Sequence, residues 1–310
     1  MCARSRPPEG TLSLLTYFQA IVIGLLQGVT ELFPISSLGH SVLLPGWLGW
    51  DNLVRGQSAS ESFYLAFLVG VHVATAVALL VFFRQDWVRI VGGFFRSVRR
   101  RRIESADERL AWLLIVATIP AGITGLLLEH TFRTVFAKPF AAAVFLTING
   151  LILLGGERVR RRTEVRELAR AHPTAGGADV EEGRQLATLD FKEAGVIGLA
   201  QTFALLAGIS RSGITMVAGL VRGLNHEDAA RFSFLLATPI IFAAGIYKLP
   251  DLAGHNGEHV RGQVLVGSLC AAVAAYLSVR FLVRYFTSHN LNPFAVYCLV
   301  VGVASMIRFA

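Results

Sequence analysis

Long apolar runs constrain this chain more than any other feature of its sequence. They lie near residues 64–83, 112–128, 140–156, 231–249, 262–283 and 293–307. Each is roughly long enough to cross a hydrocarbon core of about 30 Å as a tilted helix. Hydrophobic residues make up 54% of the chain and charged residues only 16%, which is the balance of a membrane protein. The sequence therefore predicts an all-α integral membrane protein with about six transmembrane helices.

Two further apolar stretches, near residues 18–35 and 194–221, are interrupted by proline, glycine and serine. Irregular backbone at membrane depth is tolerated only where it lines a polar cavity, because its N–H and C=O groups find no partner in lipid. We therefore interpret both stretches as re-entrant helix hairpins. Their irregular centres, PISSLGH at 34–40 and AGISRSGIT at 207–215, are expected to meet in one pocket near the middle of the membrane.

The two hairpins resemble each other in sequence. A shift of 174 residues sets GLLQGVTELFPISSLG (24–39) on GLAQTFALLAGISRSG (198–213), with identical residues at seven positions. Each hairpin is followed by three apolar runs, and the two hairpins are expected to begin on opposite sides of the membrane. This pattern predicts an inverted repeat.

We predict a single polytopic membrane domain over residues 1–310. Its first repeat spans residues 15–156 and its second spans 194–310. Residues 157–193, which are rich in arginine, alanine, glycine and glutamate, are interpreted as a solvated, basic cytoplasmic linker.

The formal net charge of +8 is concentrated in two arginine-rich segments, 84–109 and 157–184. By the positive-inside rule both segments are cytoplasmic, so the chain termini and the segments 41–62, 129–139 and 250–261 are expected to face outward. This topology, with contacts to anionic membrane lipids, explains the excess of basic over acidic residues. No nucleic-acid partner is expected, because no basic patch is interleaved with aromatic residues.

Cys2, Cys270 and Cys298 show no paired spacing, and two of them lie within apolar runs. We therefore expect packing roles for them rather than a disulfide framework or a zinc site. The first ten residues resemble the start of a signal peptide. No small-residue cleavage site follows before Thr30 and Glu31, so cleavage is not expected.

The polar residues of the two hairpins define the chemistry of the predicted pocket. They are Gln27, Glu31, Ser36, Ser37, His40, Gln201, Ser210, Arg211, Ser212 and Thr215. Arg211 carries a planar, permanently charged fork that suits phosphate oxygens, and the glycine- and serine-rich loop offers backbone N–H groups at a helix start. Both features favour a phosphate or pyrophosphate ligand.

Spacing within the first hairpin suggests further roles. Ser37 and His40 are three residues apart, so on one helical turn the imidazole would reach the hydroxyl and act as its base. Gln27 and Glu31 are four residues apart, which lets their oxygens point at one cation or at His40. Structural interpretations stay open: the serines would cap helices, His40 would be a buried structural group, and Arg211 would only pair with Glu31.

The first loop, in which Gln27 and Glu31 precede PISSLGH, resembles the "(E/Q)xxxE" and "PxSSxGH" signatures of the undecaprenyl pyrophosphate phosphatase family, also known as bacitracin resistance proteins. The second loop resembles the family's "PGxSRSGxT" signature, and the similarity extends over residues 15–310. The resemblance implies a phosphatase of the bacterial plasma membrane, with an active site that opens to the outer face. It would remove the terminal phosphate of undecaprenyl pyrophosphate and so regenerate the lipid carrier of cell-wall synthesis.

The same resemblance assigns roles to individual residues. Arg211 and neighbouring N–H groups would hold the pyrophosphate, Ser37 would attack the terminal phosphorus, and His40 with Glu31 would manage the protons. Water would then clear the phosphoserine. A nucleophilic His40 or a directly activated water stays open as a rival mechanism. The additional substrate- or phosphate-binding residues that the motifs imply are Gln27, Ser36, Ser210, Ser212, Gly213 and Thr215.

The family resemblance also implies a divalent cation, Mg²⁺ or Ca²⁺, with Glu31 as its expected ligand and Gln27 beside it. Gln27 stands where many relatives have glutamate, which leaves Glu31 as the only carboxylate of the motif. Ala207 replaces the usual proline before Gly208. His72, a polar residue within the next apolar run, stays open as a partner behind the site residues.

Two other classes of function stay open at the level of sequence. An inverted repeat with an anion site at the middle of the membrane is also typical of a transporter, here a flippase of a polyprenyl phosphate. A membrane scaffold would leave the buried polar loops unexplained. Ser37 with His40 favours the enzyme, because transport needs an anion clamp such as Arg211 but no nucleophile and base. The expected partners are polyprenyl pyrophosphate and membrane lipids, and a homodimer is an open alternative.

Overall fold

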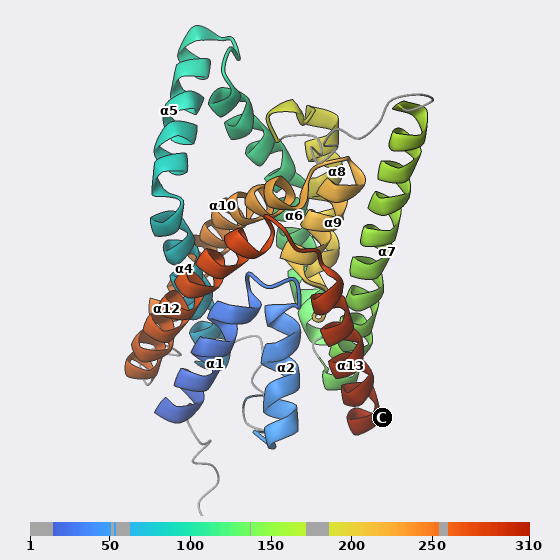
Figure 1. Cartoon of the computed structure of the whole chain (residues 1–310). Helices are drawn as coiled ribbons and strands as arrows, with labels where there is room; N and C mark the ends of the chain where they lie inside the picture. The colour runs from blue at the N-terminus through green and yellow to red at the C-terminus, as the bar shows by residue number, and fades with distance from the viewer. Residues whose placement is uncertain (1–14, 51–52, 54–62, 137, 172–185, 254–259) are drawn as a thin grey trace, which may run out of the picture.

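The computed structural model of this protein describes residues 15–50, 53, 63–136, 138–171, 186–253 and 260–310. Regular secondary structure in these residues is entirely helical (Figure 1), which confirms the all-α prediction. The long helices are α4 (Phe63–Phe82), α6 (Ala106–Phe136), α7 (Pro139–Ala171), α10 (His226–Ala253), α12 (Arg261–Tyr285) and α13 (Asn292–Phe309). The shorter ones are α1 (Tyr17–Thr30), α2 (Ser37–Leu48), α5 (Arg84–Arg100), α8 (Phe191–Gln201) and α9 (Arg211–Val221), with 3₁₀ turns η1 (Leu186–Thr188) and η2 (Thr202–Leu205).

The predicted membrane spans correspond to helices of this set. Five of them, α6, α7, α10, α12 and α13, are long and apolar enough to cross a bilayer. The remaining predicted span, 64–83, coincides with α4, which turns through 86° into α5. The turn occurs where Arg84 and Asp86 follow the apolar run, so the chain leaves the apolar medium at that point. The described part of the chain therefore has five spans, or six when the bent pair counts as one, and the protein is a multi-pass membrane protein.

Two hairpins of short helices enter the bundle from opposite ends, and their loops approach each other inside it (Figure 1). The first hairpin is α1 with α2, and the second is α8 with α9. Each second helix begins at a serine cap: Ser36 accepts a hydrogen bond from the Gly39 N–H at 3.2 Å, and Ser210 accepts one from the Gly213 N–H at 3.1 Å. These caps satisfy helix-terminal N–H groups that lipid would leave unpaired. The 174-residue shift aligns both serines and both glycines.

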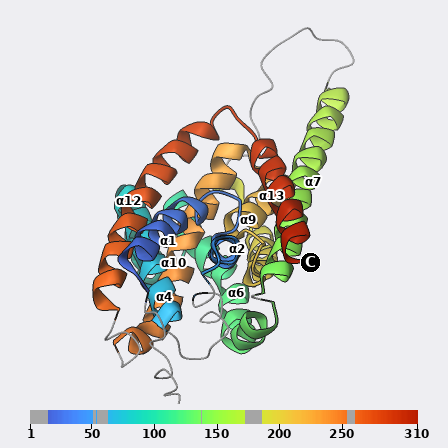
Figure 2. The ribbon, with the colours of Figure 1, turned by 90° about the horizontal axis from the view of Figure 1, so that it is seen from below.

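The helices pack with an approximate two-fold pattern. α1 lies along α12 and α8 lies along α6, while α7 pairs with α13 and α4 with α10 (Figures 1 and 2). A Cβ atom at Gly24 would lie 2.3 Å from the Gly267 carbonyl oxygen, and one at Gly198 would lie 2.3 Å from the Ala117 carbonyl oxygen. Such close approach at small residues drives helix association in lipid. This matched packing is what the predicted inverted repeat requires.

The structure differs from the predicted linker at its start. α7 continues to Ala171, past the predicted boundary at residue 157, and Glu157 is buried. Glu157 Oε1 accepts hydrogen bonds from His226 Nε2 at 2.6 Å and from the Leu291 N–H at 2.8 Å, which ties α7 to α10 and to the start of α13. The sequence did not indicate these contacts. Composition alone does not show whether a glutamate in an arginine-rich segment is buried and paired or exposed to solvent. Residues 172–185 lie outside the described residues.

Candidate active site

The loops of the two hairpins touch through small residues, as predicted. Ser36 Oγ accepts hydrogen bonds from the Gly39 and Gly208 N–H groups, both at 3.2 Å. A Cβ atom at Gly39 would lie 2.9 Å from the Gly208 Cα, so the approach requires glycine. Ser36 has a φ of 72°, a left-handed conformation that costs a non-glycine residue about 1–3 kcal/mol. The strained serine thus holds the two hairpins together through its hydroxyl.

Asn149 of α7 joins the same two loops. Its Nδ2 donates to the Pro34 carbonyl oxygen at 3.0 Å, and its Oδ1 accepts from the Ser210 N–H at 2.9 Å. The side chain is fully buried. Sequence reasoning missed this residue, although an asparagine inside the apolar run 140–156 is itself a signal of function or of polar pairing.

Glu31 and Arg211 form the charged centre of the site. Glu31 Oε1 lies 2.8 Å from Arg211 Nη2, and Glu31 Oε2 accepts from Gln27 Nε2 at 3.0 Å. Among the described residues, Arg211 Nη1 and Gln27 Oε1 have no hydrogen-bond partner, and neither amide atom of Gln201 has one. Buried polar atoms are normally paired. Arg211 Nη1 is therefore a donor available to an anion, and Gln27 Oε1 is an acceptor available to a cation or a donor.

Ser37 is placed to act as a nucleophile. It is the first residue of α2, and its hydroxyl donates to Glu31 Oε2. A carboxylate that already accepts the hydroxyl proton is in the position of a general base. His72 of α4 faces the same carboxylate, with its Nε2 3.6 Å from Glu31 Oε2. This contact places His72 next to Glu31, although its role was open at the level of sequence.

The predicted contact between His40 and Ser37 is wrong. His40 Nδ1 lies 2.7 Å from the Ser36 carbonyl oxygen, and His40 Nε2 lies 2.9 Å from the Tyr297 hydroxyl on α13. The Ser37 hydroxyl points toward Glu31 instead, and the imidazole pairs with the Ser36 carbonyl oxygen four residues before it. His40 therefore holds α2 against α13, and Glu31 takes the place next to the serine hydroxyl. Nothing in the sequence indicated Tyr297, because tyrosine is common in membrane helices.

The other predicted phosphate-binding side chains mostly hold the second loop in shape. Ser210 Oγ lies 3.0 Å from Ser212 Oγ, and Thr215 Oγ1 lies 2.7 Å from Ser233 Oγ on α10. Gly213 donates its N–H to the Ser210 cap. These contacts position the start of α9 beside the start of α2. Two helix N-termini, each with a partial positive charge, therefore favour an anion here.

Cys270 and Cys298 are free thiols. Cys298 is buried on α13, with its Sγ 3.4 Å from Asn149 Nδ2, so it packs behind the loops. Cys2 lies outside the described residues.

The chain is similar to known proteins over almost its whole length. Residues 20–304 match the family described as bacitracin resistance protein BacA. The chain is 58% identical to undecaprenyl-diphosphatase 2 of Frankia alni, over 96% of this chain and 98% of the relative. It is 57% identical to the undecaprenyl-diphosphatase of Mycolicibacterium paratuberculosis over the same shares, and 43% identical to undecaprenyl-diphosphatase 2 of Chromobacterium violaceum over 93% of this chain and 97% of the relative. The chain therefore belongs to the bacitracin resistance protein BacA family.

Proposed function

We propose that this protein is an undecaprenyl-diphosphatase, which hydrolyses undecaprenyl pyrophosphate to undecaprenyl phosphate and inorganic phosphate and so recycles the lipid carrier of cell-wall synthesis. The names of its relatives supply the substrate. One observation carries the reaction type: the Ser37 hydroxyl donates to Glu31, beside an Arg211 nitrogen that has no partner among the described residues. A nucleophile, a base and an anion clamp together support phosphoryl transfer, whereas a flippase would need only the clamp.

The arrangement supports a two-step mechanism. Arg211 Nη1 and the N-termini of α2 and α9 hold the terminal phosphate. Ser37 Oγ attacks its phosphorus while Glu31 takes the hydroxyl proton, the bond from this phosphorus to the bridging oxygen breaks, and undecaprenyl phosphate leaves. Water then attacks the phosphoserine, which releases inorganic phosphate and restores Ser37. His72, whose side chain is 28% exposed beside Glu31, is placed to exchange protons with the leaving oxygen.

The oxygen donors of the site fit a divalent cation. Gln27 Oε1 is a buried amide oxygen without a partner among the described residues, and Glu31 and Ser37 add hard oxygens next to it. No cluster of three or more His, Cys, Asp or Glu occurs in the described part of the chain, so phosphate oxygens of the substrate would have to complete the ligand set. Such a set favours Mg²⁺, held by Glu31 and Gln27, over Ca²⁺, which needs more oxygen ligands. When bound, the cation would neutralise charge on the pyrophosphate.

The active site is proposed to open to the outer face of the bacterial plasma membrane. Arginine-rich α5 and the arginine-rich end of α7 lie at one end of the molecule, while the start of α1 and the end of α13 lie at the other (Figure 1). By the positive-inside rule the first end is cytoplasmic, so the first hairpin enters from outside.

Phosphate release from undecaprenyl pyrophosphate by the detergent-purified protein tests the function. We expect Ser37→Ala to lower kcat by roughly a thousandfold or more, and Arg211→Lys, which keeps the charge but loses the fork, by roughly a hundredfold. Ser268→Ala is the matched control, because Ser268 is a half-buried serine of α12 without a hydrogen bond to the described residues.

Three outcomes separate the alternatives. A Ser37→Ala variant that keeps more than about a tenth of the wild-type kcat would favour a directly activated water over the phosphoserine. A folded wild-type protein that binds the substrate through Arg211 but releases no phosphate would favour the flippase. Loss of release only in the Ser37 and Arg211 variants supports the proposed enzyme.

A further inference from the structure

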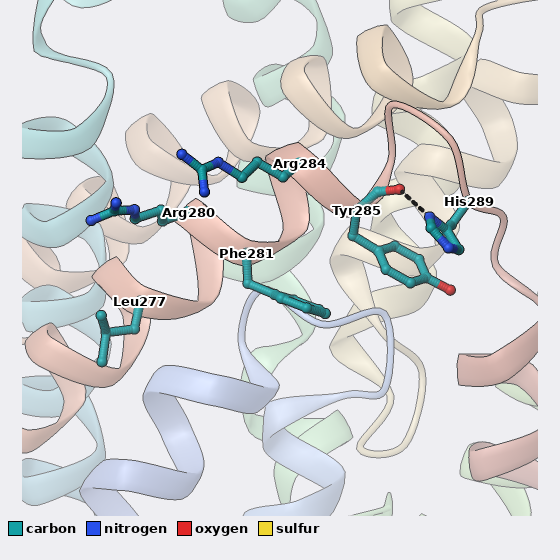
Figure 3. Close-up of a pocket in the computed structure, with 6 residues that line it drawn as sticks. All are labelled: Leu277, Arg280, Phe281, Arg284, Tyr285 and His289. Atoms are coloured by element: carbon teal, nitrogen blue, oxygen red, sulfur yellow. Dashed lines mark hydrogen bonds between the residues drawn. The ribbon is translucent and has the colours of Figure 1, made fainter.

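The C-terminal half of α12 carries a pocket of about 430 Å³ that the proposed reaction does not use (Figure 3). It is lined by Leu277, Arg280, Phe281, Arg284, Tyr285 and His289. No acidic residue is among them. The pocket therefore combines cationic side chains with an apolar and aromatic wall.

The two arginines have no counter-charge in the described part of the chain. Arg280 and Arg284 are four residues apart on α12, are exposed, and form no ion pair or side-chain hydrogen bond with the described residues. Figure 3 shows both side chains running in the same direction from the helix. Residues at this spacing share one helix face, so the two guanidinium groups can engage one anion together. Arginine forks match phosphate oxygens in particular.

The aromatic wall extends from these cations to the active-site loop. His289 stacks on Tyr285 with ring centroids 4.6 Å apart, Tyr285 stacks on Phe281 at 5.6 Å, and Phe281 stacks on Phe33 at 6.0 Å. Phe33 lies in the first hairpin loop, where its carbonyl oxygen accepts a hydrogen bond from Ser212. Leu277 and Phe281 are more than half exposed beside the arginines. A ligand with a phosphate at one end and a hydrocarbon chain at the other matches both parts of this surface.

We propose that this pocket binds the phosphate group of an anionic membrane lipid on the cytoplasmic side, at a site separate from the Ser37 centre. α12 starts at the end of the predicted outward segment 250–261 and has Arg284 in its last turn, so its C-terminal end faces the cytoplasm. Basic pockets on the cytoplasmic side of membrane helices bind lipid head groups. A glycerophospholipid such as phosphatidylglycerol and a polyprenyl phosphate present the same lipid phosphate.

Native mass spectrometry of the full-length protein tests the proposal, with phosphatidylglycerol, phosphatidylcholine or undecaprenyl phosphate added at matched concentrations. The pocket variant is Arg280→Gln/Arg284→Gln. The matched control is Arg158→Gln/Arg162→Gln, which removes the same charge from two exposed arginines that are also four residues apart, on α7. We expect roughly thirtyfold weaker binding of the anionic lipid by the pocket variant, the loss that follows when two near-surface cationic contacts are removed. The control is expected to bind like wild type.

Comparing the three added lipids identifies which kind of lipid supplies the phosphate group. Arginine-dependent binding of phosphatidylglycerol, stronger than that of phosphatidylcholine, assigns the pocket to glycerophospholipids. Arginine-dependent binding of undecaprenyl phosphate alone assigns it to a prenyl lipid. Equal binding by wild type and pocket variant overturns the proposal, and so does an equal loss in both variants, which would mean only a general effect of charge.

A second variant guards against misfolding. Arg280→Lys/Arg284→Lys keeps both charges but not the planar forks, so lipid affinity is expected to fall by less than in the glutamine variant. Thermal unfolding without added lipid is expected to be unchanged in both, because neither arginine is paired in the described structure. Added phosphatidylglycerol or undecaprenyl phosphate should raise Tm in wild type and not in the glutamine variant. A lipid-induced rise of the same size in that variant would contradict the site.

Discussion

Glu31 is the residue on which both hairpins converge. One of its oxygens pairs with Arg211 of the second hairpin, and the other accepts from Ser37 and Gln27 of the first. Removing a carboxylate from water is expensive, and charge-assisted hydrogen bonds of this kind compensate for it. The same bonds orient the Ser37 hydroxyl. Stability and the proposed chemistry therefore depend on one set of contacts.

Glu31→Gln keeps the shape of the side chain but removes its negative charge. Ser37 loses its base, and Arg211, whose side chain is only 14% exposed, loses its ion-pair partner. We expect kcat for phosphate release to fall by about 10²–10⁴ and the free energy of unfolding to fall by about 3–5 kcal/mol. Steady-state release and thermal unfolding in detergent measure the two effects. The double variant Glu31→Gln/Arg211→Gln should regain much of the lost stability and none of the activity. If the single variant Glu31→Gln had the wild-type kcat, Glu31 would have no role in the mechanism.

Asn149→Leu replaces a buried amide by an apolar side chain of similar size. The Ser210 N–H loses its partner, and the Pro34 carbonyl oxygen keeps only the weak Cys298 Sγ donor at 3.9 Å. An unsatisfied buried group costs about 1–3 kcal/mol. We expect a lower Tm and a lower kcat, because the two loops are no longer held at their present separation. Asn149→Asp keeps the acceptor for Ser210 and is expected to lose less. Unchanged Tm in the leucine variant would show that Asn149 does not hold the loops.

Sequence spacing predicted which residues share a face, but not which side chains meet. Gln27 and Glu31, four residues apart, do form the expected contact. Ser37 and His40, three apart, do not, because Ser37 turns toward the loop and His40 reaches back to the Ser36 carbonyl. The meeting of the two loops was predictable from polar residues in apolar stretches. The partners supplied by distant helices were not, since only tertiary packing brings Asn149 and its neighbours there.

In the crossing of α7 with α13, a glycine of each helix contacts the same kind of position on the other helix. A Cβ atom at Gly150 would lie 2.9 Å from the Ala295 carbonyl oxygen, and one at Gly302 would lie 3.1 Å from the Ala143 carbonyl oxygen. Gly302 lies 152 residues after Gly150, and Ala295 lies 152 residues after Ala143. α7 and α13 therefore pack on each other through equivalent positions. Sequence comparison did not find this relation, because a single glycine in a leucine-rich run carries little information.

Gly24→Ala and Gly198→Ala test the matched crossings of the hairpins. Each new methyl group would lie 2.3 Å from a backbone oxygen, of Gly267 on α12 in one case and of Ala117 on α6 in the other, so the helices must separate. We expect both variants to lose about 1–3 kcal/mol, seen as a lower Tm in detergent. Gly122→Ala is the control: nothing lies within 4 Å of its Cβ position, so alanine should be neutral or stabilising. Equal Tm values in all three variants would contradict the proposed close packing.

Across the whole molecule, each hairpin is held by a helix from the other half of the chain. α1 lies along α12, and α8 lies along α6, so neither half contains both a hairpin and its support. The site has the same dependence, because Glu31 and Ser37 come from one hairpin and Arg211 from the other. A site between two oppositely directed hairpins is accessible in principle from either face of a membrane. The orientation of the molecule therefore decides which leaflet supplies the substrate.

Cysteine labelling in cells tests that orientation. With Cys2, Cys270 and Cys298 replaced by alanine, a single cysteine is placed either at Arg99, in the basic last turn of α5, or at Ala310, after α13. Both positions are exposed, and the two helix ends lie at opposite ends of the molecule (Figure 1). A membrane-impermeant maleimide on intact cells should label Ala310→Cys but not Arg99→Cys, because arginine-rich segments stay in the cytoplasm. Labelling of both after permeabilisation is the control. The reverse pattern in intact cells would place the first hairpin's entrance in the cytoplasm, and the phosphatase would then draw its substrate from the inner leaflet.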